Sequence, residues 1–352
     1  MSAYRPGILN FTCNICGHTC SSPMEQLSRE QPSCPNCGST VRMRGMIHAL
    51  SIALFQESRV LSDFPNDKSI KGVGLSDWIG YADPLSQKLD YENTYYHQEP
   101  MLDIMIAPEV EGTYDFLFSS DVFEHVPPPA FTAFQNSHSY LKKNGSLVFS
   151  VPYNNFGETL EHFPDLNEYF IDYLGDKPIL KNLTKNGLRQ EFNNLVFHGG
   201  AGETLEMRVF SLPSLTNLLL ESGFQSINVV KDPCFRFGVF WPQTSSLPII
   251  AKKGTCSLSA FDWGPKSLKT RKGLFKSSSG EEAVWFTHQA LAHPDQIDLY
   301  IGEEKLPNSV TVEETTSAYV PDRLRKRPGY YPLLAKYSDE DKVFIGEILF
   351  ND

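Results

Sequence analysis

Two stretches of the chain decide the fold: Tyr114-Asp-Phe-Leu-Phe-Ser-Ser-Asp-Val-Phe-Glu-His-Val126 and Tyr140-Leu-Lys-Lys-Asn-Gly-Ser-Leu-Val-Phe-Ser-Val-Pro152. Each contains a short apolar run of the length and composition typical of a buried strand. Between the two runs, apolar residues recur at helical spacing over 131–141, and Gly145 is a typical residue to end such a helix. The pair therefore predicts a strand, a crossover helix and a second strand.

The same alternation extends in both directions along the chain. Strands that alternate with helices favour a parallel sheet covered by crossover helices, which is an α/β fold. The last two strands follow one another without a helix, so we expect them to pair antiparallel at the edge. The pattern predicts strands at 69–75, 94–97, 102–104, 114–120, 146–151, 226–230 and 247–251, and helices at 43–59, from Asp83-Pro84 onward, at 131–141 and at 212–219.

Near the beginning of the chain, Cys13-Asn-Ile-Cys16 and Cys34-Pro-Asn-Cys37 form two C-x2-C pairs separated by seventeen residues. Two such turns supply the four thiolates that a structural Zn2+ prefers, and a closed four-thiolate site does no chemistry. We expect a zinc ribbon here. Free or disulfide-bonded thiols are the alternative, and Cys20 is a fifth candidate ligand that replaces Cys16 or stays unused.

Length and composition bound the class of protein. At 352 residues with 41% hydrophobic and 21% charged residues, the chain predicts a globular protein of two or three domains. Residues 1–10 lack the apolar core of a signal peptide, and no run approaches the eighteen apolar residues of a membrane span. Cysteines paired at metal-ligand spacing suit a reducing compartment, so we expect a cytoplasmic protein.

The net charge of −11 is unevenly distributed. Residues 51–256 carry 15 basic and 25 acidic side chains, and an acidic domain repels a phosphate backbone. The dense basic cluster Arg323-Leu-Arg-Lys-Arg327 is explained as well by a solvated loop. Nucleic acid is therefore a disfavoured partner.

In an open α/β sheet, ligands bind outside the carboxyl ends of the strands. Three of the predicted strand ends carry glycines or polar side chains suited to this role. The glycines let a ligand approach the backbone, and the carboxylates accept hydrogen bonds from it. These candidates are Gly72, Gly74 and Asp77 after the first strand, Asp103 after the third, and Asp121, Glu124 and His125 after the fourth.

The two stretches quoted first resemble class I S-adenosylmethionine-dependent methyltransferases, in which an "EHV" turn follows the fourth strand and "L-K-x-x-G" precedes the fifth. The resemblance covers roughly residues 65–255 and implies a Rossmann-like, seven-stranded sheet. It implies S-adenosylmethionine as cofactor, with its methionine part against Gly72 and Gly74, its adenine amine on Asp103 and its sulfonium beside Asp121.

The chain departs from the family pattern in two places. The glycine loop Gly72-Val-Gly74 is short, and the ribose-binding acid expected after the second strand is replaced by Tyr95-Tyr-His97. Glu99, in the next turn, is the substitute candidate. Asp77 and Glu124 complete the set of expected cofactor-binding residues.

A hydroxyl acceptor needs a general base, and histidine titrates in the suitable range. We expect the irregular stretch 153–208 to form a substrate lid that brings His162 and His198 to the site; His125 is a third candidate. The alternative for all three histidines is a structural role, in which their hydrogen bonds orient loops and turns.

From residue 257 onward the chain shows short strands separated by turn residues, as in Ala283-Val-Trp-Phe-Thr287 and Ile297-Asp-Leu-Tyr-Ile301. This pattern is typical of an all-β sandwich, and it loosely resembles the immunoglobulin-like modules appended to carbohydrate-processing enzymes. The expected division is a zinc ribbon over 1–42, a methyltransferase domain over 43–256 and a sandwich over 257–352.

Together these features predict a methyl-transferring enzyme that uses S-adenosylmethionine and carries a structural Zn2+. A sugar or polysaccharide precursor, methylated on oxygen, is the expected large acceptor. The alternatives are an RNA methyltransferase that reads RNA through the zinc ribbon, and a non-enzymatic interaction protein whose methyltransferase domain has lost its cofactor. An NAD-dependent enzyme is more distant because G-x-G-x-x-G is absent.

Overall fold

The structure is a computed structural model that describes residues 7–175, 177–198, 204–254, 258–269, 282–290, 297–337 and 342–351. It divides into two compact units, Met1–Ile47 with Val60–Gly254 and His48–Arg59 with Thr255–Asp352. The predicted boundary at 256/257 falls on residues outside the described ranges. No helix in the described part of the chain is both long and apolar enough to cross a bilayer.

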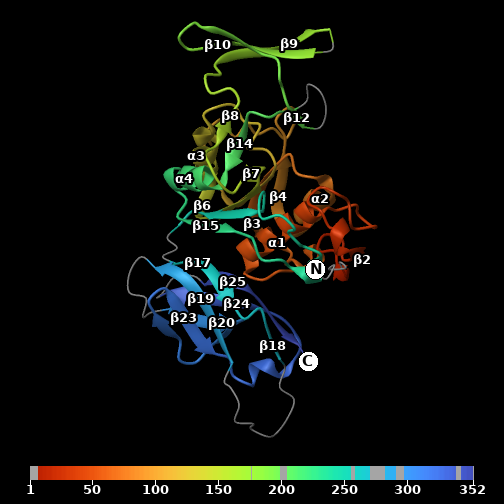
Figure 1. Ribbon diagram of the computed structural model, residues 1–352, viewed down its shortest axis with the longest axis vertical. Coiled ribbons are helices and arrows are strands. Elements are labelled where there is room, and N and C mark those ends of the chain that lie inside the picture. The colour runs from red at the N-terminus through yellow and green to blue at the C-terminus, as the bar shows by residue number, and fades with distance from the viewer. Residues whose placement is uncertain are drawn as a thin grey trace, which may run out of the picture. The chain divides into compact units, whose positions relative to one another are not determined.

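The first unit is built on a six-stranded sheet (Figure 1). Four neighbouring strands, from β6 to the edge strand β4, are parallel, whereas β16 pairs antiparallel with both β6 and β15. The α/β prediction and the antiparallel edge pair are confirmed. The order is β15-β16-β6-β5-β3-β4, with β3 at Asp67–Leu75, β4 at Leu89–Thr94, β5 at Tyr114–Ser120, β6 at Leu141–Ser150, β15 at Ser226–Val229 and β16 at Ile249–Lys252.

The seventh strand of the expected sheet is not formed among the described residues. At the predicted third strand, 102–104, the chain makes only an isolated parallel bridge between Tyr95 and Met101. The predicted strand at 94–97 was also misplaced, because β4 ends at Thr94. The next residues form a loop, with Tyr95 N donating to the Pro100 carbonyl and Leu102 N to the Tyr95 carbonyl.

Four helices lie wholly or partly in the first unit: α1 at Val41–Phe55, which runs on into the second unit, α2 at Ile79–Lys88, α3 at Ala130–Tyr140 and α4 at Leu212–Glu221. The predicted start of α2 at Asp83-Pro84 was wrong. Pro84 lies inside the helix, which the burial of Tyr81, Ala82 and Leu85 stabilises. Short 3-10 helices occur at Met24–Gln26, Leu61–Asp63, Phe235–Phe237 and Leu324–Lys326.

The sequence predicted that Gly145 ends the helix α3, and this was wrong. The helix ends at Tyr140, and Gly145 lies inside β6. A Cβ at this position would lie 3.1 Å from the carbonyl oxygens of Tyr114 and Asp115, so glycine allows β6 to approach β5 closely where their register shifts.

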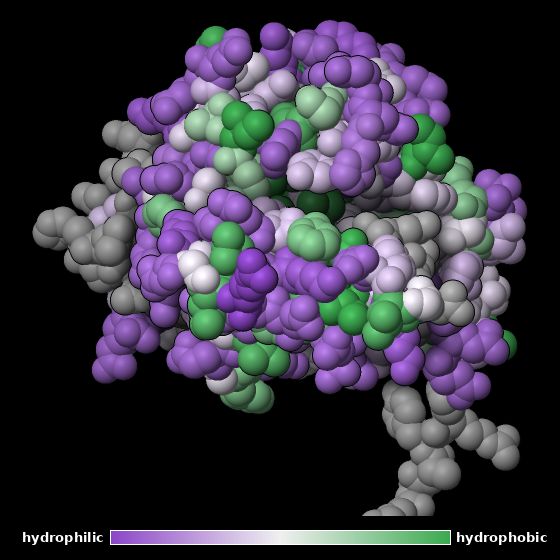
Figure 2. Space-filling view, turned by 90° about the horizontal axis from the view of Figure 1, so that it is seen from above, coloured by the Kyte–Doolittle hydropathy of each residue, from purple (hydrophilic) through white to green (hydrophobic). Residues whose placement is uncertain are grey.

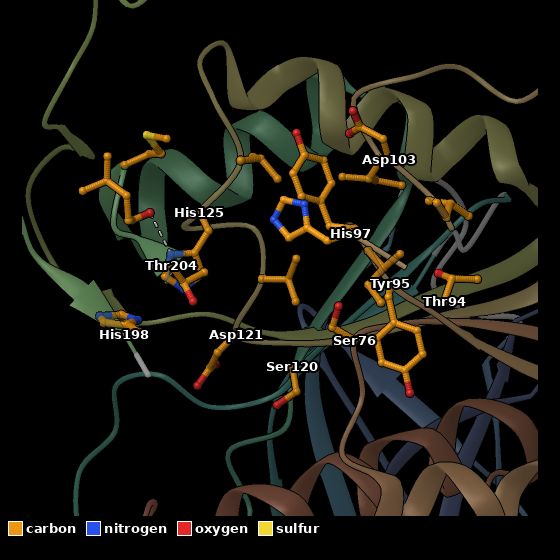
Figure 3. A pocket seen from close by; sticks show the side chains of 18 of the residues that line it. Ser76, Thr94, Tyr95, His97, Asp103, Ser120, Asp121, His125, His198 and Thr204 are labelled. Atoms are coloured by element: carbon orange, nitrogen blue, oxygen red, sulfur yellow. Dashed lines mark hydrogen bonds between the residues drawn. The ribbon is translucent and has the colours of Figure 1, made fainter. Parts of the chain in front are cut away.

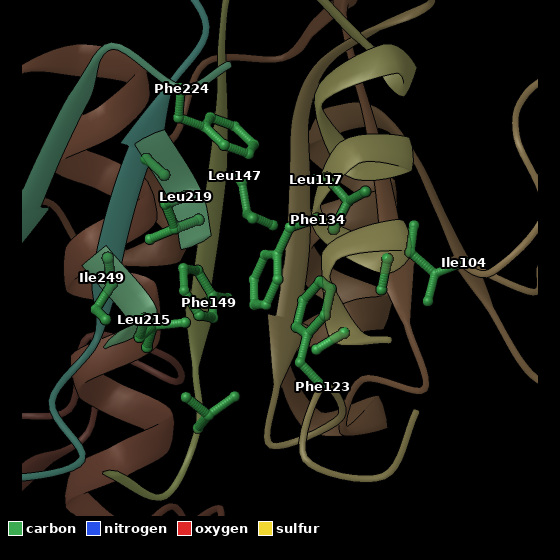
Figure 4. Close-up of a cluster of buried hydrophobic side chains, with 14 of the residues drawn as sticks. Ile104, Leu117, Phe123, Phe134, Leu147, Phe149, Leu215, Leu219, Phe224 and Ile249 are labelled. Carbon is green, nitrogen blue, oxygen red and sulfur yellow. The ribbon is translucent and has the colours of Figure 1, made fainter. Parts of the chain in front are cut away.

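The core of the sheet unit lies between the strands and helices α3 and α4 (Figure 4). Phe123 stacks on Phe134 with ring centroids 4.5 Å apart, and Phe149 meets both rings edge-on. All three side chains are fully buried. Burial of each is worth about 2–3 kcal/mol, so this aromatic cluster fixes the turn that follows β5.

The stretch 153–208, expected to be irregular, contains short strands. Its antiparallel sheet β11-β10-β9 carries exposed Phe170, Tyr173 and Leu174. Figure 2 shows the molecule from above the view of Figure 1, and this face is mainly hydrophilic with hydrophobic residues scattered over it. Residues 199–203 of the expected lid lie outside the described ranges. The strands are β7 Tyr153–Asn154, β8 Leu160–Glu161, β9 Glu168–Leu174, β10 Lys177–Leu183, β11 Arg189–Phe192, β12 Phe197–His198, β13 Thr204–Leu205 and β14 Arg208–Ser211.

The second unit contains two antiparallel-rich sheets, β17-β19-β23-β22 and β18-β25-β24-β20-β21, whose buried side chains form one core. This arrangement is a two-layer β domain; its likeness to immunoglobulin modules stays a prediction. The strands are β17 Leu258–Gly264, β18 Ser267–Lys269, β19 Ala283–Ala290, β20 Ile297–Ile301, β21 Glu304–Lys305, β22 Val310–Val312, β23 Thr315–Tyr319, β24 Gly329–Tyr337 and β25 Val343–Asn351.

Candidate cofactor and active site

A cavity of about 1120 Å³ lies at the carboxyl ends of β3, β4 and β5. Ser76, Thr94 and Asp121, which follow or end these strands, all line it (Figure 3). This is the edge at which parallel α/β sheets bind ligands. The volume is ample for a drug-sized or nucleoside-sized molecule.

The two glycines of the first strand serve packing inside the sheet unit. A Cβ at Gly72 would overlap the Phe116 ring, and one at Gly74 would overlap the Tyr91 hydroxyl and Asp77. Neither glycine is among the residues lining the cavity. Their predicted role against the methionine part of a cofactor stays a prediction, and the structure adds a steric reason for glycine at both positions.

Asp77 is buried beneath this strand end rather than in the cavity lining. Its carboxylate accepts hydrogen bonds from Tyr81 Oη at 2.9 Å and Tyr91 Oη at 2.6 Å. Burial raises the pKa of Asp77 to about 7, although these two hydroxyls and the charge of Arg42 act in the opposite direction. The Asp77 carboxyl group therefore links the end of β3 to β4 through Tyr91 and to α2 through Tyr81.

Asp103, the predicted adenine-binding residue, is part of the cavity lining, and its role stays a prediction. Asp103 lines the cavity and its Oδ1 accepts a hydrogen bond from Met105 N at 2.9 Å. Tyr95 and His97 line the same side, seen to the right of Figure 3. Glu99 is exposed and lies outside the lining, where its carboxylate accepts from Met101 N at 3.1 Å.

Asp121 is held by two arginines that the sequence analysis did not identify. Arg29 binds it through both guanidinium ends, at 2.9 Å and 2.7 Å, and Arg42 Nε lies 3.3 Å from it. Burial raises the pKa of Asp121, but the hydrogen bonds and charge of the arginines outweigh this, and the pKa lies below its ordinary value. Asp121 has φ of +56° and also accepts from Ser150 Oγ.

Both arginines belong to the cysteine-bearing segment and the start of α1, and both line the cavity. Arg42 also donates to Ser120 Oγ at 2.6 Å and to Glu30 at 2.9 Å. No local motif marks these arginines in the sequence. Only the folding of residues 24–42 against the carboxyl end of β5 brings them to the site.

The turn after β5 places Glu124 and His125 side by side. Glu124 is completely buried, and burial, followed by the charge of Asp121, holds its pKa well above the ordinary value. His125 lines the cavity, and its Nδ1 donates to the Leu205 carbonyl at 2.9 Å. Burial lowers the pKa of His125, so the neutral imidazole is favoured.

His198 also lines the cavity, whereas His162 does not. Glu206 joins them: its carboxylate lies 3.0 Å from His162 Nε2 and 3.1 Å from His198 Nε2. The rings of His125 and His198 are 4.8 Å apart and nearly perpendicular. The structure therefore assembles the three predicted histidines around one corner, with two of them at the cavity wall.

Arg208 braces this corner and was also missed at the sequence level. Its side chain is fully buried, and Nη1 donates to the Phe123 carbonyl at 2.9 Å and to the Val126 carbonyl at 2.7 Å. Nε donates to Glu161 at 2.6 Å. The carbonyl before the "EHV" turn and the carbonyl of its last residue are thereby fixed by a residue 85 and 82 positions away in the chain.

The four paired cysteines cluster as their spacing predicted. Cys13 Sγ lies 3.7 Å from Cys37 Sγ, and Cys16 Sγ lies 3.6 Å from Cys34 Sγ. Four thiolates at zinc-bonding distance form a tetrahedron with edges of about 3.8 Å; these two separations match it, and all four sulfurs lie within 4.8 Å of one another. Cys20 is outside the cluster, and its Sγ contacts the His18 carbonyl.

A segment within this unit, residues 60–229, matches the family model described as a methyltransferase domain. The match and the strand order described above show that this segment is similar to methyltransferase domains. No curated protein matches the chain.

Among solved structures, the chain is similar to a putative S-adenosylmethionine-dependent methyltransferase from Listeria monocytogenes, at 18% identity and TM-score 0.36 over 60% of this chain and 99% of that one. It is also similar to the 1,6-didemethyltoxoflavin-N1-methyltransferase of Burkholderia thailandensis, at 15% identity and TM-score 0.34 over 60% and 79%. With TM-scores this low, neither likeness bears on the acceptor.

Proposed function

We propose that the protein transfers a methyl group from S-adenosylmethionine to a hydroxyl of a sugar-like acceptor. The observation that carries the proposal is the lining of the cavity at the carboxyl ends of β3, β4 and β5: a carboxylate, Asp103, at one side and two arginines, Arg29 and Arg42, at another. These are partners for an adenine amine and for an amino-acid carboxylate, the two ends of this cofactor.

The residues present fit the cofactor in size and in chemistry. Asp103 would accept from the exocyclic amine, with Tyr95 and His97 beside the rings, and Arg42 would bind the carboxylate while Arg29 holds Asp121. When bound, the cofactor supplies an electrophilic methyl group on a sulfonium. Catalysis by the protein is then mainly alignment of the acceptor with that methyl group.

Two features of the chain support an oxygen acceptor. His125 and His198 stand at the cavity wall, and the neutral imidazole of His125 is suited to take a proton from a hydroxyl group. His162 lies behind them on the same carboxylate, Glu206, and would orient His198. The acidic composition of residues 51–256 supports an uncharged sugar over a nucleic acid.

Titration calorimetry with S-adenosylhomocysteine tests the cofactor, and a radiolabelled methyl screen on nucleotide sugars, oligosaccharides and RNA tests the acceptor. Micromolar binding and label on a sugar oxygen are the expected results. Label on RNA would favour the alternative in which the cysteine module reads RNA. A folded protein that binds no S-adenosylhomocysteine would overturn the proposal in favour of an interaction protein.

A further inference from the structure

Glu124 is a buried carboxyl group without a visible partner. Its side chain is completely buried, and neither oxygen has a hydrogen-bond partner among the described residues. Burying a polar group unsatisfied costs about 1–3 kcal/mol, and more if it is charged. Natural structures satisfy most such groups with protein, water or an ion. A carboxyl group left in this way therefore points to a ligand at the same place.

Two imidazoles, those of His125 and His198, lie beside the Glu124 carboxyl group. His125 Nε2 lies 3.7 Å from Glu124 Oε1, and its Nδ1 donates to the Leu205 carbonyl, which leaves the lone pair on Nε2. His198 Nε2 lies 3.1 Å from a Glu206 carboxylate oxygen, so Nδ1 is its other ring nitrogen, away from that contact. An imidazole whose other nitrogen donates to a carbonyl or carboxylate is the usual arrangement of a metal-binding histidine.

We propose that Glu124, His125 and His198 form a binding site for a divalent metal ion, separate from the four-cysteine cluster. One ligand atom from each of the three residues lies within 4.8 Å of the other two. Ligands that bind an ion at about 2.1 Å lie roughly 3–4 Å from one another, so a contraction of about 1 Å closes the site. His198, on the short strand β12 at the cavity wall, is the ligand placed to make that movement.

The ligand set selects the kind of ion. Two imidazoles and one carboxylate suit Mn2+, Fe2+, Co2+ or Zn2+ and do not provide the oxygen-rich shell that Ca2+ requires. Arg29 and Arg42, two positive charges that act on Glu124, are already paired with Asp121 and Glu30. The carboxyl of Glu124 is therefore available to a cation.

Three protein ligands leave coordination positions open. His125 and His198 line the cavity, so the open positions face the space in which the acceptor would lie. The ion would occupy the imidazole lone pairs, so it would hold the acceptor oxygen in place of a histidine base; this part of the inference rests on the proposed methyl transfer to oxygen. The binding of the ion itself does not depend on it.

Manganese titration followed by electron paramagnetic resonance tests the site. The full-length protein is first loaded with zinc at its cysteines, because thiolates bind Mn2+ poorly and the added ion then reports other sites. We expect one bound Mn2+ per chain, with affinity lowered at least about tenfold in Glu124→Gln and in His198→Ala. His18→Ala, at an exposed histidine outside the cavity, is the control, and its affinity should stay within about threefold.

Absence of Mn2+ binding in the wild-type protein, or equal binding in all variants, would overturn the proposal. His198 is partly exposed, so His198→Ala should fold even if Glu124→Gln does not. S-adenosylhomocysteine binding is measured on the same samples. Metal binding without cofactor binding would contradict the proposed function and support the metal site. Cofactor binding without metal binding would support the proposed function and contradict the metal site.

Discussion

Arg29 and Asp121 form a two-pronged ion pair, with Nη1 2.9 Å from Oδ2 and Nη2 2.7 Å from Oδ1. They lie 92 positions apart in the chain. One belongs to the segment between the two cysteine pairs, and the other directly follows β5, a strand inside the sheet. The cysteine module is therefore part of the cavity wall, and its folding and the state of the candidate site should be linked.

The arginine beside this pair gives the first prediction. Arg42→Met should weaken S-adenosylhomocysteine binding about tenfold or more, because a charge-assisted hydrogen bond to the ligand carboxylate is worth about 1.5–3 kcal/mol. Binding of methylthioadenosine, which has no amino-acid part, should change little. Calorimetry with both ligands measures the difference. Arg189→Met, at an exposed arginine outside the cavity, is the control; an equal loss for both ligands would refute the assignment.

Asp103 should contribute to binding of the adenine group, at the end of S-adenosylhomocysteine opposite the amino-acid carboxylate. Asp103→Ala is expected to weaken S-adenosylhomocysteine and methylthioadenosine by the same factor, about tenfold, because both contain the adenine group and a hydrogen bond to a charged carboxylate is lost. Glu99→Ala, outside the cavity lining, is the matched acidic control. Unchanged affinity in Asp103→Ala would remove this residue from the cofactor site.

The buried carboxyl of Asp77 should make stability depend on pH. Its pKa is about 7 in the folded protein against an ordinary value of 3.8, so the favourable protonated state contributes fully below about pH 4 and is lost as the pH rises towards 7. The loss amounts to roughly 4 kcal/mol for a shift of this size. Asp77→Asn should therefore remove a decline in unfolding free energy between pH 4 and 7.

Urea unfolding at several pH values compares the two proteins. Asp172→Asn, at an exposed carboxylate, should leave the wild-type pH profile nearly unchanged and serves as the control. Parallel profiles for the wild-type protein and Asp77→Asn would show that Asp77 is ionised throughout this range.

Removal of metal from the cysteine cluster should destabilise the cavity as well as the module. The chain is expected to hold one Zn2+ in its four cysteines, and Cys16→Ser or chelation should lower the melting temperature by about 10 °C because the loss of a structural site is worth several kcal/mol. S-adenosylhomocysteine binding should fall in parallel, since Arg29 and Arg42 depend on the module.

Zinc content and thermal unfolding measure this linkage. Cys20→Ser is the informative control, because Cys20 is a buried thiol outside the cluster and should keep one zinc per chain. Loss of zinc in Cys20→Ser with retention in Cys16→Ser would reverse the ligand assignment.

Arg208→Met should destabilise the protein by about 3–5 kcal/mol, as expected when one partner of a buried charged network is removed. The side chain is fully buried and bonds two carbonyls of the turn and the Glu161 carboxylate. Denaturant unfolding measures the change, with Arg189→Met as an exposed control expected within about 0.5 kcal/mol of wild type. A similar small effect in both variants would show that the turn holds its shape without Arg208.

The sequence indicated the strands wherever an apolar run was uninterrupted, as at 114–120 and 146–151. The prediction failed where exposed charged residues alternate with buried apolar ones. In β4, buried Leu89 and Tyr91 alternate with exposed Asp90 and Glu92, and the predicted strand was placed after this segment instead of on it. It failed again where a single residue suggested a boundary, at Pro84 and Gly145, because tertiary packing overrides local preference.

The sequence by itself determined the α/β core, the antiparallel edge pair and the cysteine cluster, because spacing along a strand, a helix or a tight turn fixes which neighbouring residues share a face or a metal. Only the tertiary structure decided the composition of the site. Arg29 reaches Asp121, Arg208 reaches the turn at Phe123, and His198 reaches His125 across distances in sequence that no local pattern records. Such contacts depend on how separate elements pack, and packing is a property of the whole folded unit.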